Sequence, residues 1–217
     1  MPFTVEDFLA VFARYNEAIW PLQILAYLTG AGIVALLARP GRGSAAAITL
    51  ALAGLWAVNA VGYHWHFFSA INPLARLFGA LFLIQAGLLA ACAVWARDLR
   101  FAFVADARGI AGAALIAFAV VVYPLWGWAA GHHYPAVPMF GVAPCPTTIF
   151  TIGVLVMGTW RIVRFLLVVP VLWSAVGGSA AVLLGVPQDH GLAVSGLIAV
   201  ALAIGHWLGV RFAVRLR

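Results

Sequence analysis

The chain has 217 residues, of which 65% are apolar and only 8% are charged, and its mean hydropathy is +1.08. A soluble domain of this size needs more polar surface to cover itself, so the composition excludes an ordinary soluble protein. The formal net charge of +6 comes from twelve basic residues, all arginine; their position beside apolar runs is typical of membrane boundaries and argues against a nucleic-acid partner.

The first predicted element is a short amphipathic helix over residues 4–16. Thr4 can cap its first turn, and Asp7 follows three residues later. Phe8 and Phe12 are spaced so that they share one apolar face. We expect this helix to lie along the outer membrane interface. The alternative is that these residues form the first turns of the first membrane span.

Seven apolar segments are predicted to cross the membrane, at about residues 18–38, 45–68, 74–96, 110–130, 147–160, 165–185 and 191–210. All but the fifth are long enough to cross about 30 Å of hydrocarbon. The predicted fold is therefore all-α: a polytopic membrane helix bundle with seven transmembrane helices. It forms a single integral membrane domain over residues 1–217. If the fifth and sixth segments form a hairpin that does not cross, the count is five.

The arginines predict the orientation of the bundle. Ten of the twelve fall in the first, third and fifth links and in the C-terminal tail, and only Arg14 and Arg76 fall on the other side. Short loops that carry such an excess face the cytoplasm. We therefore expect the N-terminus outside and the C-terminus inside, an alternation that seven crossings satisfy.

Several polar side chains are predicted at membrane depth, where an unpartnered amide or imidazole costs several kcal/mol. Asn59, Tyr63 and His66 share one stripe of the second span, and the topology places five of the six histidines toward the outside. We predict an outward-facing polar pocket between the first four spans. Its candidate ligand-binding residues are Glu17, Gln23, Asn59, Tyr63, His66, Asn72 and Gln85.

A divalent metal is an open alternative, because zinc or copper needs two to four His, Cys or carboxylate ligands that converge on the ion. The candidate ligands are His66, His132 and Asp189. The sequence has no local pair of ligands with metal-binding spacing, so histidines bonded to loops and water are the simpler explanation of the pattern. Cys145, between two prolines, is either a soft ligand or part of a rigid cap on the fifth span.

Two cofactors are not expected. His66 and His132 could supply the two axial ligands of one haem, but His206 is alone at its depth and cannot hold a second. Retinal is excluded, because its Schiff base requires a lysine and the chain has none.

Three stretches carry a resemblance to a known family: YNEAIWPLQ at 15–23, INPLARLFG at 71–79 and FGVAPCPTTIFTIG at 140–153. Together they resemble a family of small multi-spanning bacterial inner-membrane proteins of unknown function, over essentially the full length. Members are sometimes labelled permeases, a term that describes hydropathy more than activity. The resemblance implies a multi-pass protein of the bacterial inner membrane and supplies no catalytic residue.

The leading functional interpretation is a membrane protein that binds or transports a small solute or metal ion through its outward-facing pocket. A second is a structural or accessory subunit of a larger membrane complex, or a homo-oligomer, with the lipid bilayer as its other partner. A third is a metal-dependent membrane enzyme. No sequence feature names the solute.

Overall fold

The computed structural model describes the backbone of residues 3–215 and the side chains of residues 3–179 and 183–208. The described chain is all-α, as predicted, with one isolated bridge between Phe101 and Gly158 and no strand. Its elements are α1 (Val5–Ala18), α2 (Leu22–Leu37), α3 (Arg42–Val58), the π-helical η1 (Asn59–Phe67), the 3-10 turn η2 (Phe68–Ala70), α4 (Ala75–Trp95), α5 (Ala107–Ala117), the π-helical η3 (Phe118–Val122), α6 (Tyr123–Ala129), α7 (Pro144–Val156), α8 (Trp160–Leu166), α9 (Val168–Leu184), the 3-10 turn η4 (Pro187–Asp189) and α10 (His190–Arg215).

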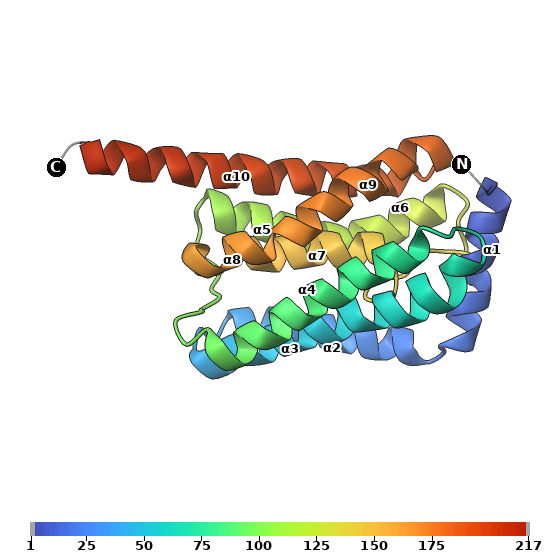
Figure 1. Ribbon diagram of the computed structural model, residues 1–217, viewed down its shortest axis with the longest axis horizontal. Coiled ribbons are helices and arrows are strands. Elements are labelled where there is room, and N and C mark those ends of the chain that lie inside the picture. Colours follow the sequence, from blue (N-terminus) through green and yellow to red (C-terminus); the bar gives the residue numbers. More distant parts are fainter. Residues whose placement is uncertain (1–2, 216–217) are drawn as a thin grey trace.

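The long helices run side by side along one axis, and α1 lies across one end of this bundle (Figure 1). The chain bends by 86° between α1 and α2. Thr4 caps α1 through the reciprocal pair predicted from the sequence: its hydroxyl accepts from the N–H of Asp7, whose carboxylate accepts from the N–H of Thr4. The amphipathic helix expected at 4–16 is therefore a helix of its own, separated from α2 by this bend.

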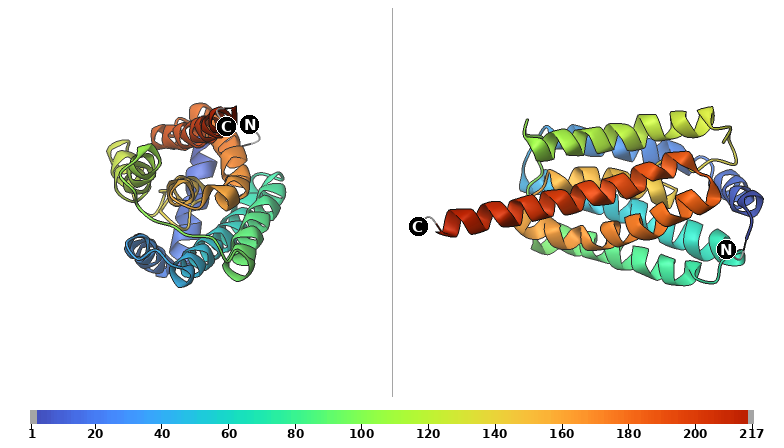
Figure 2. Two further views of the ribbon diagram at one scale, coloured as in Figure 1. Left: turned by 90° about the vertical axis from the view of Figure 1, so that its left-hand side faces the viewer. Right: turned by 90° about the horizontal axis from the view of Figure 1, so that it is seen from above.

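The shortest of the predicted spans forms the centre of the bundle. Every residue of α7 is buried except the half-buried Cys145, and the other long helices surround it when the molecule is viewed from its end (Figure 2). Its thirteen residues extend roughly 20 Å at 1.5 Å per residue, which is less than the thickness of a hydrocarbon core. It ends at Val156, and residue 160, assigned to the same segment from the sequence, begins α8.

Both ends of α7 meet the requirement that buried backbone groups be hydrogen-bonded. At its start, Pro144 and Pro146 have no N–H, so two of the usual unpaired donors do not exist. At its end, Arg108 of α5 donates from Nε to the carbonyl of Val156 at 2.8 Å and from Nη2 to that of Gly158 at 2.5 Å. The guanidinium thus binds carbonyls at the negative end of the helix dipole.

Glycines allow α5 to approach α7 closely. A Cβ atom at Gly112 would lie 2.5 Å from the carbonyl oxygen of Gly153, and one at Gly153 would lie 2.8 Å from that of Gly112. Both distances are shorter than any real side chain tolerates against backbone. The backbones of the two helices therefore meet at this pair, a form of packing common between helices in membranes.

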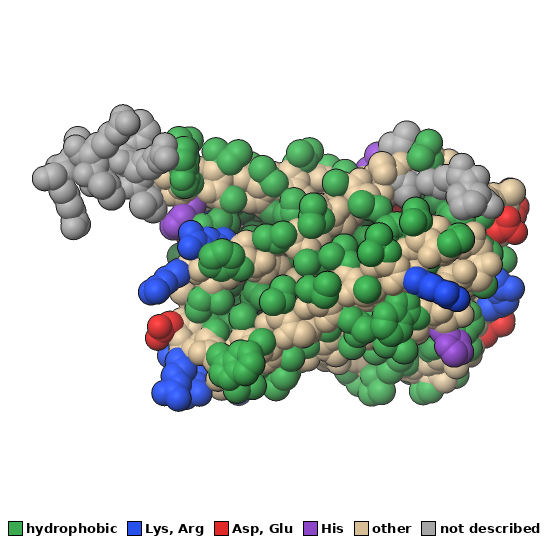
Figure 3. Space-filling model, in the orientation of Figure 1, with side chains coloured by type: hydrophobic (Ala, Val, Ile, Leu, Met, Phe, Trp, Pro, Cys, Tyr) green, Lys and Arg blue, Asp and Glu red, His purple; other side chains and the backbone are tan. Residues whose placement is uncertain are grey.

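The flanks of the bundle are apolar, and the charged side chains lie mainly at its two ends (Figure 3). Large apolar residues that are more than half exposed occur on α2, α4, α9 and α10, with Leu28, Leu77, Leu183 and Leu197 each above 60%. By length and composition, four described helical segments could cross a membrane, or up to six if each of two bent pairs counts as one. The central α7 is shorter than this requirement, so the count of seven stays a prediction.

Replacing Gly112 with Ala should weaken the contact between α5 and α7. The new methyl group meets backbone, which cannot move aside as a flexible side chain can, so we expect a loss of about 1–3 kcal/mol in unfolding free energy. Gly87 of α4 is the matched control, because a Cβ there has no neighbour within 4 Å. Gly87→Ala should be neutral or stabilising by up to about 1 kcal/mol. Unfolding in detergent measures both; equal effects would contradict this account of the crossing.

Candidate functional site

The buried amides predicted to bind a ligand contact the backbone instead. Gln23 donates to the carbonyl of Asn16, near the end of α1, at 2.8 Å. Asn59 donates to the carbonyl of Gly141, in the loop before α7, at 3.0 Å, and Gln85 donates to that of Leu166, the last residue of α8, at 2.9 Å. Each amide therefore satisfies a carbonyl near a place where the chain leaves a helix or enters the bundle.

Two further predicted residues lie on the surface. Glu17, near the end of α1, and His66, on η1, are both exposed. His132 is half-buried, and its Nδ1 lies 3.1 Å from Nε2 of Gln188. The described residues contain no group of three or more His, Cys, Asp and Glu side chains that could hold a metal ion. His66, His132 and Asp189 are thus not brought together.

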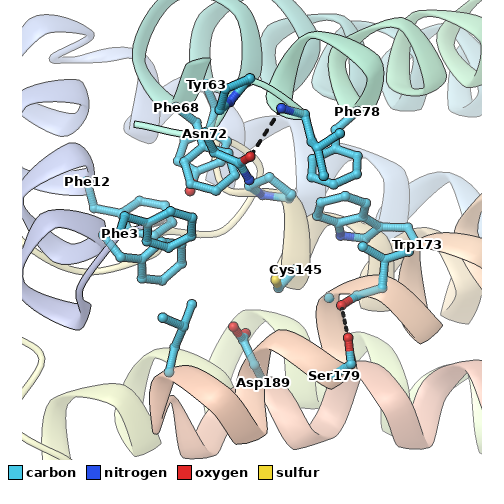
Figure 4. A pocket seen from close by; sticks show the side chains of 17 residues that line it. Phe3, Phe12, Tyr63, Phe68, Asn72, Phe78, Cys145, Trp173, Ser179 and Asp189 are labelled. Atoms are coloured by element: carbon cyan, nitrogen blue, oxygen red, sulfur yellow. Dashed lines mark hydrogen bonds between the residues drawn. The ribbon is translucent and has the colours of Figure 1, made fainter. Parts of the chain in front are cut away.

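A cavity of about 370 Å³ lies at the end of the bundle that α1 crosses (Figure 4). It is lined by α1, η1, η2, the start of α4, the start of α7, α9 and η4. Three predicted residues, Tyr63, Asn72 and Asp189, are among its lining. The cavity therefore differs in place from the pocket predicted between the first four spans: the start of α7 and the sixth predicted segment contribute to it, and α2 does not.

Aromatic rings form most of the cavity wall. On one side, Phe12 stacks on Tyr63 with ring centroids 4.9 Å apart, and Tyr63 stacks on Phe68 at 5.3 Å. On the other side, Phe78 meets Trp173 edge to face at 5.3 Å. The rings of Phe3 and Phe8 complete the lining near α1. These rings pack against each other as well as facing the cavity, so the wall keeps its shape.

The polar part of the wall is centred on Asp189. This carboxylate is only 4% exposed; it accepts a short hydrogen bond from the hydroxyl of Tyr123 and lies within hydrogen-bonding reach of the Cys145 thiol. Asn72 and Ser179 also line the cavity, and their side chains bind the backbone N–H of Leu74 and a backbone carbonyl of α9, respectively. Neither Arg nor His is found among the described residues that line the cavity.

One buried histidine lies behind the aromatic wall. His64 has no exposed surface, and neither ring nitrogen has a hydrogen-bond partner among the described residues. Its ring contacts Phe82 and Trp173, with centroids 4.7 and 5.2 Å away. His64 does not line the cavity, so it supports the wall from behind.

Sequence reasoning missed most of the aromatic wall. Phe8 and Phe12 were recognised as one face of an amphipathic helix, and that face does point toward the cavity. Phe68, Phe78 and Trp173 come from three other elements, and no spacing in the sequence connects them. Cys145 fits the role of a cap, since Pro144 begins α7, and it also reaches the cavity.

Comparison with known proteins identifies a family but no characterised relative. A family model, described as a family of unknown function (DUF6064), matches residues 5–213, and the chain therefore belongs to this family. This agrees with the resemblance to a family of unknown function seen in the sequence. No curated protein and no solved structure matches the chain.

The contact between His132 and Gln188 predicts a pH dependence of stability. Burial, with a smaller contribution from neighbouring His133, lowers the pKa of His132 below its ordinary value of 6.5, and the hydrogen bond to Gln188 opposes this only in part. The unfolded chain then binds more protons than the folded one below pH 6.5, so stability falls as pH decreases from 6.5.

Thermal unfolding in detergent between pH 5 and 7.5 measures this effect. We expect the midpoint of the wild-type protein to fall more steeply toward pH 5 than that of His132→Gln, which has no proton to gain at this position. Identical slopes for the two proteins would show that His132 does not contribute.

Proposed function

We propose that this family member is a multi-pass protein of the bacterial inner membrane that binds a small, largely apolar solute in the cavity beneath α1. The observation that supports this most directly is the cavity itself, whose wall comes from elements far apart in the sequence. Its volume lies within the range of small-molecule sites, which are mostly apolar with a few polar groups that fix orientation. The apolar lining replaces the polar pocket expected from the sequence.

The surface supports the membrane assignment. Leucines that are more than 60% exposed on α2, α4, α9 and α10 would face water in a soluble protein, and a contiguous apolar flank of this kind is not stable there. In a bilayer the same side chains face hydrocarbon, and the backbone N–H and C=O groups of each helix are hydrogen-bonded within that helix. In this proposal seven segments cross, with α7 enclosed by the others, so that its short length does not have to match the bilayer.

The arginines support the orientation. The links α2–α3, α4–α5 and α7–α8 lie at the end of the bundle opposite α1 (Figure 1). The first two links carry Arg39, Arg97 and Arg100, and Arg161 follows the third link in the first turn of α8. We place that end in the cytoplasm, because short cytoplasmic loops carry the excess of basic residues. The N-terminus, α1 and the cavity are then on the periplasmic side, and the C-terminus is inside.

Cysteine labelling tests this orientation. In a chain whose own Cys92 and Cys145 are replaced by Ala, a single cysteine is introduced as Glu17→Cys or Asp98→Cys; both positions are exposed, at opposite ends of the bundle. We expect a membrane-impermeant maleimide to label Glu17→Cys in intact cells, and to label Asp98→Cys only after lysis. The reverse pattern would place the cavity on the cytoplasmic side.

Solute binding is tested with two probes of the same shape, phenyltrimethylammonium and tert-butylbenzene. A ligand that binds only the folded state raises its stability, by about 2.7 kcal/mol at one hundred times its dissociation constant. We expect at least one of the two probes to raise the unfolding midpoint of the purified protein in a saturable way. The rise should be lost in Val176→Trp, which adds bulk to the cavity wall on α9.

Leu172→Trp is the matched control. Leu172 is also exposed on α9 but does not line the cavity, so this variant should respond to the probes as the wild-type protein does. If neither probe stabilises the wild-type protein, or if both variants respond equally, the cavity is not a solute-binding site.

A further inference from the structure

The charge distribution around the cavity is one-sided. Asp189 is almost fully buried at the cavity wall, and the lining contains neither Arg nor His among the described residues. Four titratable groups interact with this carboxylate. Tyr123 and Cys145 are its hydrogen-bonding partners, Tyr63 lines the same cavity, and His190 is exposed and directs its Nδ1 to the carbonyl of Pro187. None of these supplies a buried positive charge.

A carboxylate in this position is costly without a partner. Burying an ionised group in apolar surroundings is unfavourable unless it is paired and hydrogen-bonded. The hydroxyl of Tyr123 supplies a hydrogen bond and no charge. The cavity therefore offers a negative group whose natural complement is a positive group carried by a ligand.

The aromatic rings opposite Asp189 favour the same kind of ligand. Figure 4 shows Phe12, Tyr63 and Phe68 on one side of the cavity and Phe78 and Trp173 on the other, with Asp189 of η4 across the cavity from both groups. Ring faces attract cations through their quadrupole, most strongly in sites shielded from water. The rings also supply an apolar surface for the substituents of an organic ligand. The charge of Asp189 and the aromatic lining therefore favour the same ligand, a cation with apolar substituents.

We propose that the cavity binds an organic cation, a quaternary or protonated amine with apolar substituents, whose positive centre lies between the aromatic rings and the carboxylate of Asp189. This inference rests on the proposed solute-binding function and names the class of solute. An inorganic metal ion does not fit, because no group of three ligating side chains is present among the described residues. A neutral apolar solute would leave the negative charge of Asp189 without a positive partner, and an anion would be repelled by that charge.

The experiment compares phenyltrimethylammonium with tert-butylbenzene, in which a carbon atom replaces the charged nitrogen at the same shape. Dissociation constants come from the dependence of the unfolding midpoint on probe concentration in the wild-type protein. We expect the cation to bind at least tenfold more tightly than the neutral compound. Asp189→Asn should weaken binding of the cation at least tenfold and leave the neutral probe unaffected. Asp98→Asn, at the opposite end of the bundle, should change neither.

A second pair of variants tests the rings independently of the carboxylate. Phe78→Leu should weaken binding of the cation more than binding of the neutral probe, whereas Phe78→Tyr keeps an aromatic face and should bind the cation nearly as the wild-type protein does. If Asp189→Asn does not fold, the two Phe78 variants still test whether the cavity prefers a cation to a neutral compound.

The outcomes separate this inference from the function on which it rests. If tert-butylbenzene binds as tightly as the cation, or if Asp189→Asn binds the cation normally, the cavity takes an uncharged solute and the inference is wrong while the proposed function stands. If neither probe binds the wild-type protein, both are wrong.

Discussion

The structure depends on one constraint, the need to hydrogen-bond backbone groups where no water can reach them. The central α7 illustrates it best, because a helix enclosed on all sides must satisfy both of its ends within the protein. Two prolines remove donors at its start, and the guanidinium of Arg108 binds carbonyls at its end. With both ends satisfied, a helix too short to span a bilayer alone can occupy the axis of the bundle, and the longer helices pack around it.

The same constraint explains the buried amides. Breaks between α1 and α2, before α7 and after α8 each expose carbonyls to the interior, and Gln23, Asn59 and Gln85 donate to them. Asn16 acts similarly, binding the carbonyls of Pro135 and Val137 at 2.7 Å each and so fixing the long loop that precedes α7 against α1. A buried polar side chain therefore has two alternative roles: it can bind a ligand, or it can donate a hydrogen bond to the backbone of the chain itself. In this protein the second role accounts for most of the buried amides.

The cavity forms where these breaks coincide. Because α1 turns by 86° across the end of the bundle, and because η1 and η4 interrupt the helices beneath it, side chains cannot pack there as in a regular bundle. Aromatic side chains form most of the cavity wall there, since each large ring covers a wide area of the surrounding helices. Asp189 is the one acidic group that lines this cavity among the described residues, and the proposed recognition of a cationic solute rests on its charge.

The sequence by itself determined the helical class and the order of the apolar segments, because hydropathy and helical spacing are local properties of the chain. It also predicted an amphipathic helix at the N-terminus, but left open whether that helix continues into the first span. It also identified Tyr63, Asn72 and Asp189, which line the cavity, although it assigned them to different sites. Only the tertiary structure decided that α7 is central, since a helix facing lipid and a helix facing other helices are both in apolar surroundings and look alike in sequence. It also decided which polar residues meet the cavity and which meet the backbone, because that choice depends on where distant breaks in the chain come together in space.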